Sequence, residues 1–214
     1  DAKAGQWWTD NPKRGLANNS VAYTEKPSSE IFMEEWLSLV KSKSGERGIF
    51  NREAAGKQAA KWCRRPADLS YGFNTCSEII LRPYQFCNLT EVVIREKDKF
   101  DDLKRKVMLA TILGTAQSTL TKFPYLRKIW NKNTEEERLL GVSLTGIMDN
   151  ELTNGRKHGL EKTLTALREI AVETNKEWSA IFGIPQSTAI TCVKPSWTVS
   201  QLVDSSSGIH PRHS

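Results

Sequence analysis

The sequence predicts an α/β protein with largely parallel strands, because strand-like and helix-like segments alternate along the chain. The clearest helix covers residues 157–182, where apolar side chains recur at intervals of three and four and Gly183 follows the last turn. Residues 89–95 are rich in β-branched side chains and read as a strand. The apolar run 107–113 lies inside a long helical segment, so we expect that segment to be buried.

The other elements follow from capping residues and breakers. Ser28 or Ser29 can cap a helix over about 30–42, and Asn51 can cap a second helix that ends near Trp62. Residues 1–28 contain turn-forming pairs and read as loop. No internal repeat or flexible linker divides the chain. Further along, we expect strands at 79–81, 140–145 and 189–193 and helices at 100–121 and 124–132.

Length and composition indicate a globular protein. The chain has 214 residues, of which 38% are apolar, and it contains seven tryptophans, enough for a substantial core. Its longest apolar runs are far shorter than the roughly 20 residues of a membrane span, so we expect no membrane anchor. Residues 1–5 hold neither an initiator methionine nor a signal peptide and read like a cut inside a longer protein.

A net charge of +6 permits a polyanionic partner. Acidic residues interleave with the basic ones, as in 95–99 and 135–138, and no basic stripe carries interleaved aromatic side chains. The sequence therefore does not favour a nucleic-acid surface, although a nucleic-acid-binding module stays open on charge alone. A small phosphorylated ligand suits the charge as well.

The cysteines occupy positions 63, 76, 87 and 192, with no CxxC pair and no Cys/His spacing suited to zinc. We therefore expect no structural metal. With no secretory signal in the sequence, we expect free thiols in a reducing compartment, and hence a cytoplasmic protein.

An amide, a thiol and a carboxyl group stand at every second position, at Asn74, Cys76 and Glu78. In an extended segment these three side chains would project to one side. That face would present a hydrogen-bond donor, a sulfur nucleophile or radical, and an acid/base group. The spacing equally fits a buried structural cysteine beside two solvated polar residues.

Six motifs follow one another along the chain: residues 17–20, 45–51, 74–84, 86–89, 141–146, and 193–196 continuing to 207–211. Taken in this order, they resemble the catalytic subunit of ribonucleotide reductase. The resemblance is to the adenosylcobalamin-dependent branch, which works without a separate radical-generating subunit. It covers nearly the whole chain and implies that residues 1–214 are a fragment of the catalytic barrel. That barrel has ten strands in two parallel half-barrels, with a finger loop through its centre.

The resemblance implies a role for each residue of the central motif. Cys76 would sit at the tip of the finger loop as the thiyl radical that removes the 3′ hydrogen of a ribose. Asn74 would hold the ribose hydroxyls, and Glu78 would take the 3′ hydroxyl proton as a general base. Cys87 would be one half of a redox pair that closes to a disulfide at each turnover. In the family its partner lies upstream, and neither Cys63 nor Cys192 occupies that place, so we interpret both as structural.

By the same resemblance, the turn after Val193 binds the substrate phosphates. A tight turn that leads into a helix presents free N–H groups and a positive dipole end to an anion. Ser196, Thr198 and Ser200 would add hydroxyl donors. Trp197 stands where the family normally has glycine, and an indole there would crowd the phosphates. Thr75 and Arg47 stand where proline is usual.

The implied activity is that of an oxidoreductase, a ribonucleoside di- or triphosphate reductase that makes deoxyribonucleotides for DNA synthesis. The implied cofactor is adenosylcobalamin, and the implied partners are the ribonucleotide and a thioredoxin-like or dithiol reductant; a homodimer is compatible with the resemblance. The missing partner cysteine means that the isolated chain is expected to be inactive. The alternative is a truncated or degenerate nucleotide-binding remnant of the same fold that does not turn over.

Overall fold

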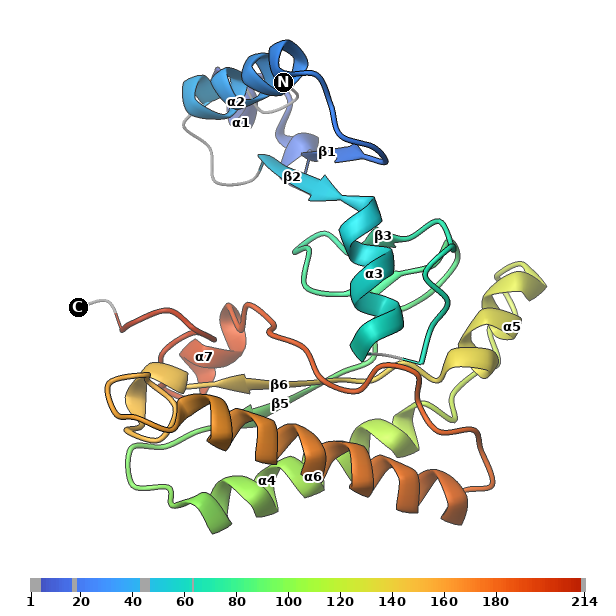
Figure 1. The fold of residues 1–214 in the computed structure, drawn as a ribbon, viewed down its shortest axis with the longest axis vertical. Coiled ribbons are helices and arrows are strands. Elements are labelled where there is room, and N and C mark those ends of the chain that lie inside the picture. The colour runs from blue at the N-terminus through green and yellow to red at the C-terminus, as the bar shows by residue number, and fades with distance from the viewer. Residues whose placement is uncertain (1–4, 17–18, 43–46, 63, 213–214) are drawn as a thin grey trace.

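A computed structural model describes residues 5–16, 19–42, 47–62 and 64–212. Figure 1 shows an elongated molecule, with β1, β2, α1 and α2 at one end and a layer formed by α4 and α6 at the other. Among the described residues, the strands form three two-stranded sheets. Two of these sheets are parallel and one is an antiparallel hairpin, so the predicted α/β class with largely parallel strands is confirmed.

The main core lies between one parallel sheet and two helices. Strands β5 (Leu89–Val93) and β6 (Gly141–Thr145) pair in parallel, and helices α4 (Phe100–Gln117) and α6 (Leu160–Ile181) pack against them (Figure 1). The apolar stripe of α6 predicted this packing, because it turns Leu167 and Ala171 toward the sheet. The buried cluster consists of Val92, Ile94, Leu103, Val107, Leu140, Val142, Leu167, Ala171 and Ile190.

The predicted strand 189–193 is reduced to a single parallel bridge between Val142 and Thr191. Its backbone still follows β6, since Val142 N donates to Ile190 O and Cys192 N donates to Val142 O. This segment therefore brings the residues that follow Cys192 to the carboxyl end of β6.

The prediction that 107–113 is wholly buried was wrong. Val107 is buried, but Leu109 and Leu113 are 57% and 64% exposed. Only one face of α4 meets the sheet and α6, so apolar residues on the other face stay outside the core.

The first strands were not foreseen. Residues 1–28 were predicted as loop, but β1 (Asn19–Tyr23) pairs in parallel with β2 (Arg47–Asn51), and α2 (Ser29–Ser42) connects them. Both strands are short, and the two strands that pair in this sheet are separated in the sequence by α2. The short elements α1 (Trp7–Asp10) and η1 (Pro12–Leu16) precede them.

Helix α3 (Arg52–Trp62) starts as predicted, because the Asn51 side chain accepts a hydrogen bond from Ala54 N. The antiparallel hairpin of β3 (Gly72–Phe73) and β4 (Ile80–Leu81) follows it. The helix predicted at 124–132 lies further along, as α5 (Lys128–Glu137). The short elements η2 (Ile147–Asp149) and α7 (Thr198–Leu202) complete the chain.

Within the described part of the chain, no helix has the length and apolar character needed to span a membrane. The same residues contain no group of three or more His, Cys, Asp or Glu side chains that could hold a metal ion.

Candidate functional site

The central motif lies in the turn of the β3–β4 hairpin and not in an extended strand, so the one-sided projection of a strand does not apply to it. Asn74 closes the turn, because its side-chain oxygen accepts Ile79 N at 3.1 Å and its backbone oxygen accepts Ser77 N at 2.9 Å. Ser77 has a positive φ of 66°, a backbone conformation that non-glycine residues adopt mainly in tight turns. A turn can gather alternate side chains as well as a strand can, and alternation in the sequence does not distinguish the two.

The turn brings the predicted amide and carboxylate into direct contact. Asn74 Nδ2 donates to Glu78 Oε1 at 2.6 Å. Cys76, half-buried, lies between them in the sequence and shares one neighbour with Glu78, the ammonium of Lys194. The structure therefore places Asn74, Cys76 and Glu78 in one cluster.

Lys194 is the member of this cluster that sequence reasoning missed. Its Nζ lies 2.9 Å from Glu78 Oε1 and 3.4 Å from Cys76 Sγ. Burial alone would lower the pKa of the Lys194 ammonium, but its hydrogen bonds to Glu78 and Cys76 raise it, so the side chain stays charged. The available signal was its position directly after a predicted strand and before the predicted phosphate turn.

One oxygen of Glu78 is left open. The side chain is only 4% exposed, and Oε1 accepts from both Asn74 and Lys194. Oε2 is buried and has no hydrogen-bond partner among the described residues. Leaving a buried acceptor unpaired costs about 1–3 kcal/mol, and more for a charged group, so this oxygen is available to a ligand that donates a hydrogen bond.

Cys87 is a free thiol at the edge of the same cluster. Burial, together with the charge of Glu78, raises its pKa, although Lys194 opposes the effect. Cys87 also lines a cavity of about 200 Å³ with Phe86, Gln117 and Phe123. Cys87 is therefore a thiol of raised pKa that lies beside an open space.

Cys192 cannot pair with Cys87 in this arrangement. Strand β6 separates them, because Gly141 N donates to Asn88 O on one side while Val142 O accepts from Cys192 N on the other. Two strand spacings amount to roughly 9–10 Å, whereas a disulfide requires Cα atoms within about 7 Å. Burial raises the pKa of Cys192 to about 12. These observations favour a structural Cys192, and Cys63 lies outside the described residues.

The predicted phosphate turn runs from Ser196 into the five-residue helix α7. Ser196 is buried, and its Oγ accepts from Gly208 N at 3.0 Å. Ser200 is buried and donates to Trp197 O at 2.6 Å. Of the three predicted hydroxyls, those of Ser196 and Ser200 thus stabilise the turn, and Thr198 is exposed to solvent.

Trp197 has an unusual backbone, with a φ of 41°. L side chains rarely adopt this region, and glycine adopts it without strain. The indole is 76% exposed. The backbone conformation is thus one that suits glycine, although a large aromatic residue occupies the position.

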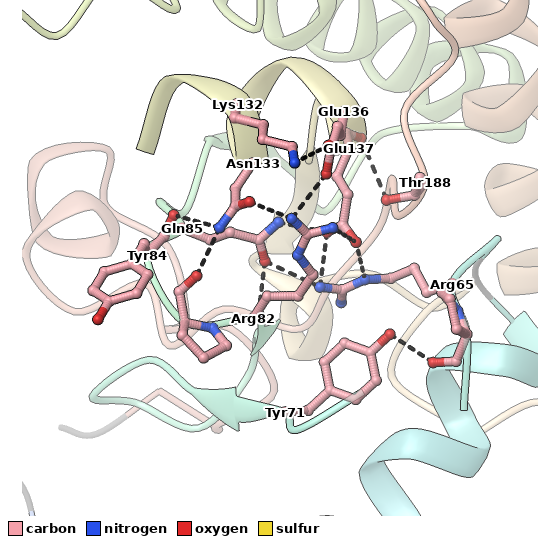
Figure 2. Close-up of polar contacts among 12 residues, drawn as sticks. Arg65, Tyr71, Arg82, Tyr84, Gln85, Lys132, Asn133, Glu136, Glu137 and Thr188 are labelled. Carbon is pink, nitrogen blue, oxygen red and sulfur yellow. Dashed lines mark hydrogen bonds and ion pairs between the residues drawn. The ribbon is translucent and has the colours of Figure 1, made fainter. Parts of the chain in front are cut away.

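A buried ionic network, shown in Figure 2, anchors the other end of the hairpin. Arg65 donates to Ile80 O of β4 at 2.7 Å and pairs with Glu137 of α5 at 2.9 Å. Gln85 donates to the same oxygen of Glu137, Oε2, while the other oxygen, Oε1, accepts from Arg65 Nε at 3.3 Å. Arg82 binds Asn133 and Glu136. We call the side chains that take part the Arg65–Glu137 network; they are those of Arg65, Arg82, Gln85, Asn133, Glu136 and Glu137. It fixes the strand that follows Glu78 to α5.

The comparisons first define the class of fold. No family model matches the chain. The structure is similar to a crystal structure of a B12-dependent (class II) ribonucleotide reductase, with a TM-score of 0.70 and 23% sequence identity over 95% of this chain and 32% of that chain. This likeness supports the α/β class. The ten-stranded barrel and the finger loop remain predictions.

Curated relatives with sequence similarity to the chain share one enzyme name. The adenosylcobalamin-dependent ribonucleoside-triphosphate reductases of Lactobacillus gasseri and Lactobacillus leichmannii are 29% and 28% identical over 94% and 92% of this chain. A probable enzyme of the same name from Dictyostelium discoideum is 28% identical over 68% of the chain. The chain spans less than a third of the length of these relatives, namely 30%, 30% and 19%. The predicted resemblance to adenosylcobalamin-dependent ribonucleotide reductases is confirmed.

Proposed function

We propose that this chain is part of the catalytic barrel of an adenosylcobalamin-dependent ribonucleoside di- or triphosphate reductase and carries its radical site. The observation that carries the proposal is the open oxygen of Glu78, which is buried beside Cys76 and lacks a partner. A carboxylate held at one oxygen and free at the other is suited to accept a proton from a substrate hydroxyl.

The proposed reaction gives a role to each residue of the cluster. A Cys76 thiyl radical takes the hydrogen atom from the ribose 3′ carbon and becomes a thiol, and Glu78 Oε2 accepts the 3′ hydroxyl proton. Asn74 uses one N–H on Glu78, and its second N–H is available to a ribose hydroxyl. The 2′ hydroxyl would leave as water with a proton from Cys87. Cys87 and a partner cysteine would then supply two electrons and the second proton as they form a disulfide. Glu78 would return its proton to the 3′ oxygen, and Cys76 would return its hydrogen atom to the 3′ carbon, which restores the thiyl radical.

The proposed cofactor is adenosylcobalamin, after the name of the relatives. When bound, it supplies by homolysis of its cobalt–carbon bond the radical that takes the hydrogen atom of Cys76. Cys76 fits such a donor, because it is half-buried in a turn and not enclosed in the core.

The proposed partners are a ribonucleotide and a thioredoxin-like or dithiol reductant, with a homodimer as a further proposal. Thr198 and the backbone N–H groups of the turn would meet the phosphates, while Ser196 and Ser200 hold the turn in shape. The cavity beside Cys87 provides space next to the thiol that the reductant must regenerate.

A second candidate is a nucleotide-binding remnant that does not turn over. The positive φ of Trp197 favours it, because a bulky residue occupies a position that suits glycine at the proposed phosphate turn. This candidate predicts nucleotide binding without reduction in the full-length protein.

The test uses the full-length protein with adenosylcobalamin, a ribonucleotide and a dithiol, and measures the deoxyribonucleotide formed. We expect product with the wild type and none above background with Cys76→Ser. Cys192→Ser is the matched control and should keep activity, since that thiol is separated from Cys87 by β6. Reduction by Cys76→Ser would contradict the radical assignment. Binding without any reduction by the wild type would favour the remnant.

A further inference from the structure

Lys194 connects two parts of the site that are distant in sequence. It follows the segment that runs beside β6, and its ammonium reaches the hairpin turn, where it contacts both Glu78 and Cys76. Its side chain is 24% exposed, so it is largely withdrawn from solvent. A long, flexible lysine loses rotamer entropy in such a position, and solvent-exposed lysines normally avoid that loss.

The backbone of Lys194 is held on both sides, which fixes where the ammonium can reach. Its N donates to Ser143 Oγ at 2.8 Å. Its carbonyl oxygen lies so close to Gly208 that a Cβ there would stand 3.0 Å away. The contacts with the turn therefore arise from a backbone segment that is held beside β6 and not from a mobile loop.

The Lys194 ammonium restricts the orientation of the Glu78 carboxylate. Asn74 and Lys194 both occupy Oε1, and Oε2 is left buried and without a partner. An amide alone would leave the carboxylate free to rotate about its last torsion. Two donors on the same oxygen, one of them charged, hold the open oxygen in one direction.

The ammonium also balances charge at the sulfur. An unpaired cation 3.4 Å from a thiol would favour the thiolate, which has no hydrogen atom to return to a ribose radical. The Glu78 carboxylate offsets that cation. Lys194 and Glu78 thus act as a pair, and the loss of either one exposes Cys76 to the charge of the other. Cys87 lies in the field of the same two charges.

We propose that Lys194 is a positioning residue of the radical site, which aims the open oxygen of Glu78 at the substrate and neutralises the carboxylate next to Cys76. This role rests on the proposed function for its place in catalysis. The charge balance at Cys76 can be measured without any turnover.

The first experiment measures the rate of Cys76 alkylation by iodoacetamide as a function of pH, in the full-length protein without cofactor and with peptide mapping by mass spectrometry. Lys194→Met removes the cation and should slow alkylation at pH 8 about tenfold, the effect of one unit in thiol acidity. Glu78→Gln removes the anion and should speed it. The double variant should lie near the wild type, and Lys194→Arg should restore it. Lys106→Met is the matched control, because Lys106 pairs with Asp98 away from the cluster.

The two single variants must shift the rate in opposite directions. A wild-type rate in Lys194→Met, with the fold verified by circular dichroism, would overturn the proposal. If Lys194→Met fails to fold, the other two variants decide the question. The proposal then requires faster Cys76 alkylation in Glu78→Gln and a wild-type alkylation rate in Lys194→Arg. Equal rates in Glu78→Gln and the wild type would also overturn it.

The second experiment measures turnover in the same variants. We expect Lys194→Met to lower kcat about a hundredfold or more with little change in KM, since a misaimed base affects the chemical step. The pH profile of kcat should shift as well, and Lys194→Arg should recover part of the rate. A full-length wild type without reductase activity would refute the proposed function, and the alkylation rates would still decide the pairing of Lys194 with Glu78 and Cys76.

Discussion

Two buried glutamates lie at opposite ends of the same hairpin region, and they are satisfied to different degrees. Glu137 is 5% exposed, and both of its oxygens have partners in Arg65 and Gln85 (Figure 2). Glu78 is 4% exposed, and only one of its oxygens has partners. The two carboxylates are therefore similarly buried and carry the same charge, and they differ in the unused acceptor.

The difference separates a structural carboxylate from one that is ready for a ligand. A fully paired buried charge stabilises one arrangement of its neighbours, and nothing further can bind to it. A partly paired one keeps a desolvated acceptor that a substrate can satisfy. The Arg65–Glu137 network fixes the hairpin, and the cluster of Asn74, Glu78 and Lys194 uses that fixed frame.

The largest expected effect is a difference in stability between two matched substitutions. Glu137→Gln leaves Arg65, whose side chain is 1% exposed, as an unpaired buried cation and should cost about 3–5 kcal/mol of unfolding free energy. Glu78→Gln keeps an amide oxygen that can accept from Lys194, whose side chain is 24% exposed, so its cost should stay below about 1 kcal/mol. Urea unfolding followed by circular dichroism measures both. Equal losses would remove the distinction between the two clusters.

The thiols around the open cluster should differ in reactivity by burial. Burial raises the pKa of Cys192 to about 12, so at pH 8 its thiolate fraction is on the order of a thousandfold below that of an ordinary cysteine. Its reactivity should rise only as the pH approaches 12. Cys87, with a pKa raised mainly by burial, should also react more slowly than an ordinary cysteine. Time-resolved alkylation with peptide mapping orders the sites. Labelling of Cys192 as fast as Cys76 at pH 8 would contradict this ordering.

The sequence predicted the elements of the main core best. The stripe of α6 and the β-branched residues of β5 each have one buried face, so a periodic pattern records their packing. The resemblance to the reductase family brought Asn74, Cys76 and Glu78 forward, and the structure brings these three together.

Other features depend on contacts that no local pattern records. The partners Arg65 and Glu137 are 72 residues apart, and Lys194 reaches Cys76 across 118 residues. The strands β1 and β2 are too short to show periodicity, and alternation at 74–78 fits a turn as well as a strand. The spacing of charged residues in the sequence alone cannot predict which of them form ion pairs in the fold.

The smallest expected effect concerns the turn that follows Lys194. Trp197→Gly relieves a positive φ that costs an L residue about 1–2 kcal/mol, and it adds chain entropy to the unfolded state that offsets about half of that gain. We expect a net stabilisation of about 1 kcal/mol or less, with tighter ribonucleotide binding by the full-length protein. Trp197→Ala is the matched control, because it removes the indole and keeps the strain. If both variants bind the nucleotide more tightly, the indole crowds the phosphates; if only glycine does, the backbone limits binding. No gain in affinity with either variant would mean that the phosphates bind elsewhere. The turn after Lys194 would then have a structural role only.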